Sequence, residues 1–160
     1  MAPVSPIPKG LHTVTPNLLF RECAKAIEFY QKAFGAQEIA RFPAPDGSSI
    51  WHSELRIGDS VLYLNDTMPG MPVSAPTPDA PSPMALWLYL EDCDAAFDRA
   101  VGAGAKAMMP PADMFWGDRM AAVADPFGYL WHFATRKKEL SPEEMRRGAE
   151  EMARSMATKR

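Results

Sequence analysis

Two stretches of this chain, separated by roughly 70 residues, share one layout. "LLFRECAKAIEFYQKAFGAQ" and "LYLEDCDAAFDRAVGAGAK" each read as an apolar strand, an acidic or polar cap, and a helix that a glycine ends. Cys23 and Cys93 fall at equivalent places in the two stretches. Because repeated sequences form repeated supersecondary units, the chain is expected to fold as two similar modules.

The helix in each copy has its own start and stop signals. In the first copy, Glu22 can cap a helix whose apolar residues recur at helical spacing, and Gly35 stands at its end. In the second, Asp92 or Asp94 provides the cap, and Gly102 or Gly104 the end. The two stretches therefore predict helices at matching positions.

Alternating apolar and polar residues with turn signals follow each helix, which indicates strands. The first half continues with strands expected at residues 37–42, 49–57 and 60–65. The second half continues with strands expected at residues 106–110, 119–124 and 129–135. Each half is then a βαβββ module, and the fold class is α+β.

Composition changes along the chain suggest five segments. Residues 67–83 lie in "DTMPGMPVSAPTPDAPSP", which is rich in proline and reads as an extended linker that can border a cleft. The segments are an N-terminal arm at 1–11, the first βαβββ module at 12–66, the linker at 67–83, the second module at 84–136 and a C-terminal amphipathic helix at 137–160.

The C-terminal helix carries a capping box. Ser141 is the expected N-cap, Pro142 the first helical residue, and Glu144 the residue that reaches back to the cap. Acidic and basic residues mix along this segment, which favours a helix packed on the protein body or on a partner subunit over one lying on a membrane surface.

Charge and apolar content exclude several classes of protein. The net charge is -3, and no broad basic field is present to hold a nucleic-acid backbone. No apolar run approaches the length of a membrane span, and no signal peptide is apparent. We expect a cytoplasmic protein with no nucleic-acid or membrane partner. Cys23 and Cys93 are expected to be buried free thiols, because two cysteines cannot build a disulfide framework.

Five stretches in order resemble the vicinal oxygen chelate superfamily, which groups glyoxalases, bleomycin resistance proteins and dioxygenases, and within it the PhnB-like branch. They are "AIEFYQKAFGA", "HSELRIGDSVLYLND", "LYLEDCDAAFDRAVGAGAK", "MPPADMFWGDRMAAVADPFGYLWHFAT" and "LSPEEM". The resemblance implies two βαβββ modules whose sheets face each other around a cleft, with helices outside. It also implies a homodimer, and leaves open whether modules pair within one chain or across two.

In metal-using members of that superfamily, the first and last strands of each module supply His or Glu ligands. The corresponding positions in this chain are Thr15, Tyr63, Ala85 and His132, of which only His132 is a standard ligand. His52 and Glu54 share one strand face and are weaker candidates. We therefore interpret the metal site as degenerate and assign no cofactor, with a divalent metal as the alternative.

Alternation along the strands also predicts which side chains line the cleft. We expect His132 to be a buried, hydrogen-bonded pocket residue rather than a general base. Trp116 is placed to close one end, and Arg119 to pair an anionic ligand group or a carboxylate such as Glu54 or Asp118. The expected ligand-binding residues are Thr15, Asn17, His52, Glu54, Tyr63, Asn65, Trp87, Tyr89, Trp116, Arg119 and His132.

Two functions fit this cleft. One is a binding protein that holds a small aromatic or oxygenated molecule by stacking. The other is a metal-dependent lyase, isomerase or dioxygenase acting on a small oxygenated substrate. No catalytic residue is assigned, and whether the chain is an enzyme stays open. A nucleophilic hydrolase is disfavoured, because the chain has no Gly-x-Ser-x-Gly elbow.

Overall fold

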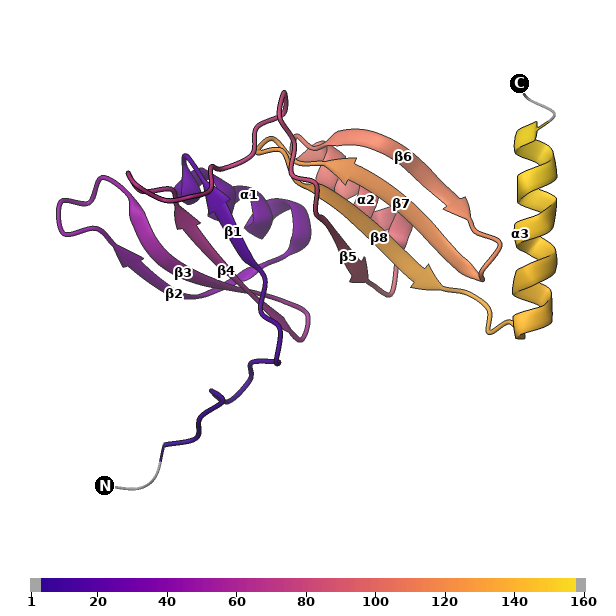
Figure 1. Ribbon diagram of the computed structural model, residues 1–160, viewed down its shortest axis with the longest axis horizontal. Coiled ribbons are helices and arrows are strands. Elements are labelled where there is room, and N and C mark those ends of the chain that lie inside the picture. Colours follow the sequence, from indigo (N-terminus) through magenta and orange to yellow (C-terminus); the bar gives the residue numbers. More distant parts are fainter. Residues whose placement is uncertain (1–3, 158–160) are drawn as a thin grey trace.

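The structure is a computed structural model that describes residues 4–157 of the 160-residue chain (Figure 1). Two four-stranded sheets have the orders β1-β4-β3-β2 and β5-β8-β7-β6. In each sheet the first and last strands of the module pair in parallel, and the remaining pairs are antiparallel. The predicted α+β fold of two βαβββ modules with a C-terminal helix is confirmed.

The elements lie close to their predicted places. No predicted strand end is off by more than one residue, except that the sixth strand extends three residues further than expected. The bounds are β1 Asn17–Phe20, α1 Cys23–Phe34, β2 Gln37–Pro43, β3 Ile50–Ile57, β4 Ser60–Asp66, β5 Ala85–Tyr89, α2 Cys93–Gly102, β6 Lys106–Asp113, β7 Asp118–Ala124, β8 Leu130–Arg136 and α3 Pro142–Ala157.

Each of the first two helices begins against a side chain from the last strand of its own module. The Cys23 N–H donates to Asp66 Oδ1 at 2.7 Å, and the Cys93 N–H donates to Thr135 Oγ1 at 2.9 Å. These contacts satisfy backbone donors that the first helical turn leaves without partners. Glu22 occupies the expected N-cap position, but its side chain makes no cap bond within residues 4–157. Asp92, one of the two predicted alternatives, accepts from the Ala95 N–H.

The two modules share one core, and they meet through their helices. Helices α1 and α2 pack on each other, and Phe34 of α1 lies against both Trp131 and Phe133 of β8, with ring centroids 4.6 and 5.7 Å apart. The helix-facing sides of both sheets therefore turn toward a common interior. The expected arrangement, with sheets facing each other and helices outside, is not what a single chain forms.

A buried carboxylate fixes this junction. Asp125, 4% exposed, accepts from Tyr30 Oη at 2.6 Å and from Trp131 Nε1 at 2.9 Å. Its other oxygen accepts the N–H groups of Phe127 and Tyr129, both at 2.9 Å, which closes the turn before β8. Burial raises the pKa of Asp125 against these hydrogen bonds, and burial likewise raises that of Tyr30.

The linker and α3 lie outside this core. Linker residue Thr77 passes so close to Gly128 that a Cβ on Gly128 would lie 2.5 Å from the Thr77 carbonyl oxygen. Helix α3 has the predicted capping box, with Ser141 and Glu144 bonded to each other. None of its described residues is buried, and it approaches the body where Gly148 meets Phe115. The five segment boundaries stay predictions, and residues 1–3 and 158–160 of the outer segments lie outside the described part.

Replacing Asp125 by alanine should destabilise the protein by about 2–4 kcal/mol, because two buried side-chain donors would lose their acceptor. Urea unfolding followed by tryptophan fluorescence measures this change. Asp79→Ala, at an exposed linker position, is the control and should change the unfolding free energy by less than about 0.5 kcal/mol. Equal stability of the two variants would contradict the role given to Asp125.

Candidate functional site

The sheet face turned away from the helices carries the candidate site in the first module. His52 and Tyr63 are edge to face with ring centroids 4.7 Å apart, and His52 Nε2 lies 3.2 Å from Glu54 Oε1. Phe42, which is exposed, stacks beside His52 at 6.0 Å. The structure thus brings three of the predicted residues together on one open face.

The corresponding face of the second module is more aromatic. Trp87 and His132 stand opposite each other on parallel strands, and their rings stack with centroids 4.9 Å apart and planes inclined by 12°. Tyr89 lies two residues along β5, with its ring 6.3 Å from that of Trp87. Trp87 is 43% exposed and Tyr89 is 61% exposed, so both rings present apolar surface to solvent.

At one end of this face a buried carboxylate joins two of the predicted aromatic residues. Tyr89 Oη donates to Asp118 Oδ2 at 2.9 Å, and Trp116 Nε1 donates to the same oxygen at 3.0 Å. The hydrogen bond to the carboxylate raises the pKa of Tyr89 and keeps its phenol neutral. The sequence indicates Asp118 only as a possible carboxylate partner of Arg119. Its position at the start of β7, beside Trp116 and Gly117, is the signal in the sequence that could have identified it.

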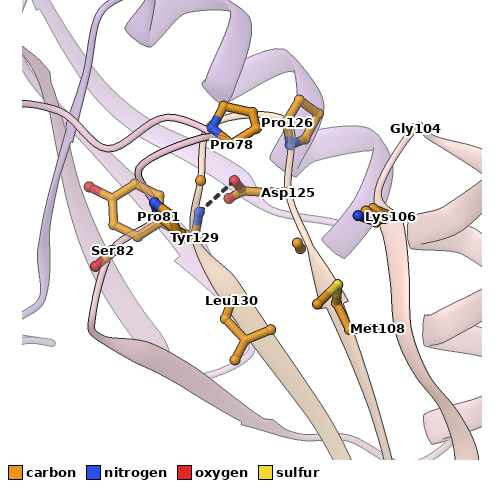
Figure 2. Close-up of a pocket in the computed structure, with 12 residues that line it drawn as sticks. Pro78, Pro81, Ser82, Gly104, Lys106, Met108, Asp125, Pro126, Tyr129 and Leu130 are labelled. Atoms are coloured by element: carbon orange, nitrogen blue, oxygen red, sulfur yellow. Dashed lines mark hydrogen bonds between the residues drawn. The ribbon is translucent and has the colours of Figure 1, made fainter.

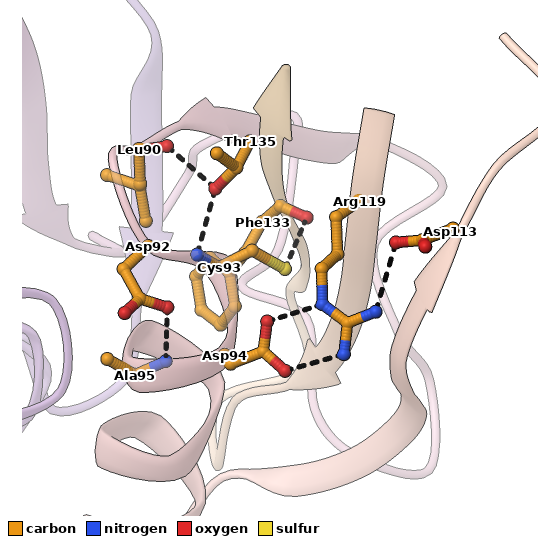
Figure 3. A network of polar contacts seen from close by, with 9 residues as sticks. All are labelled: Leu90, Asp92, Cys93, Asp94, Ala95, Asp113, Arg119, Phe133 and Thr135. Atoms are coloured by element: carbon orange, nitrogen blue, oxygen red, sulfur yellow. Dashed lines mark hydrogen bonds and ion pairs between the residues drawn. The ribbon is translucent and has the colours of Figure 1, made fainter. Parts of the chain in front are cut away.

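Arg119 lies on the other side of the sheet. It forms a two-pronged ion pair with Asp94 of α2, at 2.5 and 2.7 Å, and a third bond to Asp113 at 3.0 Å (Figure 3). These carboxylates raise the pKa of Arg119 further. The suggested pairing with Glu54 or Asp118 is not formed, and the guanidinium faces the helix rather than the open face.

The remaining predicted residues are spread out. Asn17 begins β1 opposite Tyr63, and Asn65 is buried and donates to the Asp66 carbonyl at 3.1 Å. Thr15 lies before β1 and lines, together with Trp87, a pocket of about 220 Å³ between the first module and β5. Thr15 and Trp87 are therefore the predicted residues that this chain brings together across its two modules.

His132 has an unusual environment for a histidine. Its Nδ1 is buried and has no hydrogen-bond partner within residues 4–157. The expectation that its polar atoms would be satisfied was wrong, because Trp87 covers one face of the ring and offers no acceptor in its plane. Burial lowers the pKa of His132 below its usual value, so the imidazole resists protonation.

The donor set does not fit the divalent metal that the resemblance implies. The parallel register places Asn17 opposite Tyr63 and Trp87 opposite His132, so neither first strand offers a His or carboxylate at these positions. Across residues 4–157, no three His, Cys, Asp or Glu side chains form a group that could hold an ion. Cys23 does not help, because burial raises the pKa of its thiol to about 12.

A separate pocket of about 400 Å³ lies where the linker crosses the second module (Figure 2). Pro78 and Pro81 of the linker form one wall, and Met108 and Leu130 lie across from them. Asp125, which lines one end, is already fully hydrogen bonded. This pocket is apolar and offers shape rather than directional contacts. The linker does border a cavity, as its proline content suggested.

A fold of two βαβββ modules is shared by a known class of proteins, and comparison with known proteins identifies the family. The family model described as "Glyoxalase/Bleomycin resistance protein/Dioxygenase superfamily" matches residues 10–133. The chain belongs to this superfamily. An uncharacterized Mycobacterium tuberculosis protein is 40% identical over 135 residues, which cover 82% of this chain and 79% of that protein.

Solved structures agree with this placement. TioX from Micromonospora sp. ML1 has a TM-score of 0.63 at 25% identity, covering 78% of this chain and 98% of TioX. A PhnB protein from Bacillus cereus has a TM-score of 0.59 at 16% identity, covering 78% and 99%, which shows a shared fold alone. Membership of the PhnB-like branch therefore stays a prediction. Over residues 4–157, no helix is long and apolar enough to cross a bilayer.

The half-buried position of His132, with Nδ1 shielded from solvent, predicts how the imidazole titrates. In a proton NMR titration, the imidazole signal that disappears in His132→Gln should have a pKa below about 6.5, because burial disfavours the charged ring. The folded pKa is lowered, so the stability carried by neutral His132 is complete above the unfolded pKa of about 6.5 and is lost as the pH falls below that value through the folded pKa. His12→Gln assigns a second signal as an internal control. A His132 pKa above 6.5 would contradict this environment.

Proposed function

We propose that this protein binds a small aromatic or oxygenated molecule against the open face of its second module. The observation that carries the proposal is the exposed pair of rings, Trp87 and Tyr89, fixed from behind by His132 and Asp118. Aromatic rings held in one orientation offer flat apolar contact at little entropic cost. The hydrogen-bonding groups beside them can orient an oxygenated substituent.

A second copy of the chain completes the cleft in this proposal. Within one chain, α1 and α2 lie in the shared interior, so the open faces of the two sheets point away from that interior. The first module then offers His52, Glu54 and Tyr63 to a neighbouring copy, while the second offers Trp87 and Tyr89. Exposed apolar surface on both faces supports a homodimer with modules paired between chains.

Binding without metal chemistry is favoured over the metal-dependent alternative by the donor set. An imidazole whose ring face is covered by Trp87, and a first-strand partner that is tryptophan, do not make a His and carboxylate site. The reaction-based alternative would need ligands drawn from His52 and Glu54 of a neighbouring copy. Their mutual contact at 3.2 Å satisfies them without an ion.

Titration with 2-naphthol should quench tryptophan fluorescence saturably, and Trp87→Ala should weaken its affinity at least about tenfold by removing the stacking surface. Trp51→Ala is a matched control. Trp51 is also an exposed strand tryptophan, but in the alternation of β3 it belongs to the helix-facing set with Ser53 and Leu55. That variant should bind as the parent does. The proposal fails if 2-naphthol gives no saturable signal, or if both variants lose affinity equally.

Metal analysis separates the two functions. The purified protein, dialysed and then titrated with Ni, Zn, Mn and Fe(II), should retain less than about 0.1 equivalent of any ion, because only one imidazole occupies the family's ligand positions. Stoichiometric metal that is lost in His132→Ala or in His52→Ala would overturn this expectation and favour the metalloenzyme. The Asp79→Ala variant, changed at an exposed surface position, is the control and should retain the same amount of metal as the parent.

A further inference from the structure

The carboxylate of Asp118 is buried, but its hydrogen bonding is incomplete. Its side chain is 1% exposed, and Oδ2 accepts both ring donors, Tyr89 Oη and Trp116 Nε1. Oδ1 is buried and receives no hydrogen bond from any residue in the range 4–157. A buried carboxylate normally fills its acceptor positions, so one acceptor here is left for another donor.

The nearest cation is a weak partner. Arg136 Nε lies 3.8 Å from Asp118 Oδ1, beyond hydrogen-bond distance, and the Arg136 side chain is 65% exposed. An exposed guanidinium in this position is screened by solvent and moves readily. A ligand can therefore displace it. No other Lys, Arg or His in the described chain forms an ion pair with Asp118.

The rings around this carboxylate are suited to a cation. The faces of tryptophan and tyrosine rings attract cations through their quadrupole, most strongly where water is excluded. Tyr89 donates its hydroxyl hydrogen to a carboxylate, which increases the electron density of the phenol ring. Trp87 extends the aromatic surface along the same strand, with its ring 6.3 Å from that of Tyr89.

From these contacts we propose that the Asp118 end of the open face is a subsite for an organic cation, an alkylated ammonium group carried by the bound molecule. The subsite consists of Asp118, Tyr89, Trp116 and Trp87. The cationic group lies over the Tyr89 ring beside the carboxylate and replaces Arg136 as its counter-ion. The aromatic or oxygenated remainder extends toward Trp87 and His132. This assignment rests on the proposed function and specifies the charge of the ligand.

An anionic ligand is the opposite assignment, and the charges disfavour it. Arg136 could attract an anion, but the buried negative charge of Asp118 lies between that guanidinium and the Tyr89 and Trp116 rings. The negative faces of the rings also repel anions. An anion would thus meet two unfavourable interactions for one favourable contact with an exposed side chain.

The test uses three probes of nearly the same shape on the full chain: (3-hydroxyphenyl)trimethylammonium, its uncharged isostere 3-tert-butylphenol, and 3-hydroxybenzenesulfonate. The parent protein should bind the ammonium probe at least about tenfold more tightly than the uncharged one, and the preference should shrink as salt is added. Asp118→Asn keeps the shape and can still accept from both rings. It should lose that preference while its affinity for 3-tert-butylphenol stays within about twofold.

Asp113→Asn is the matched control, since Asp113 is an exposed acid that pairs with Arg119 on the helix side and should leave all three affinities unchanged. Should Asp118→Asn fail to fold, Arg136→Gln serves as the second variant: it removes the exposed counter-ion of Asp118 and should raise the ammonium preference. Equal affinity for the charged and uncharged phenols, tighter sulfonate binding, or an unchanged preference in both site variants would overturn the subsite. Binding of 3-tert-butylphenol in those cases would leave the aromatic site standing, whereas binding of no probe would overturn both.

Discussion

The architecture depends on one buried carboxylate. Asp125 receives four hydrogen bonds, from α1, from β8 and from the turn between β7 and β8, and so ties the first helix of one module to the sheet of the other. A charge in that position is tolerated only because each oxygen is fully used. Asp125 holds α1 against the sheet of the second module, and α1 also packs on α2, so both sheets turn their remaining faces outward. The candidate site is a direct consequence of that orientation.

The second module contains another buried carboxylate, Asp118, whose hydrogen bonding differs from that of Asp125. There two ring donors share one carboxylate oxygen, while the other oxygen receives no hydrogen bond from the described part of the chain. One acid thus completes the core, and the other stands at the edge of an exposed aromatic face. Asp125 is structural because all its hydrogen-bond acceptors are used, which stabilises the arrangement around it. Asp118 is suited to a ligand because one of its oxygens can still accept a hydrogen bond.

Much of this fold could be predicted from the repeat. Helical spacing and turn residues locate the elements, because local preferences and packing agree in them. Strand alternation could also have predicted the side of the sheet on which Arg119 lies. Arg119 alternates in register with Ala121 and Val123, which are fully buried in the core, so it belongs on the helix side. The sequence could not show Trp87 opposite His132, because parallel register depends on how two distant strands pair. It also could not show that the helices of the two modules meet, which is decided by tertiary contacts such as Phe34 with Trp131.

We expect ligands to bind the open aromatic face, outside the pocket under the proline-rich linker. Nitrogen-15 correlation spectra recorded during titration with (3-hydroxyphenyl)trimethylammonium locate the contact directly. We predict that the indole signals of Trp87 and Trp116 and the backbone amides of Tyr89 and Asp118 shift most. Shifts concentrated instead at Lys106, Met108 and Leu130, around the linker pocket, would contradict it.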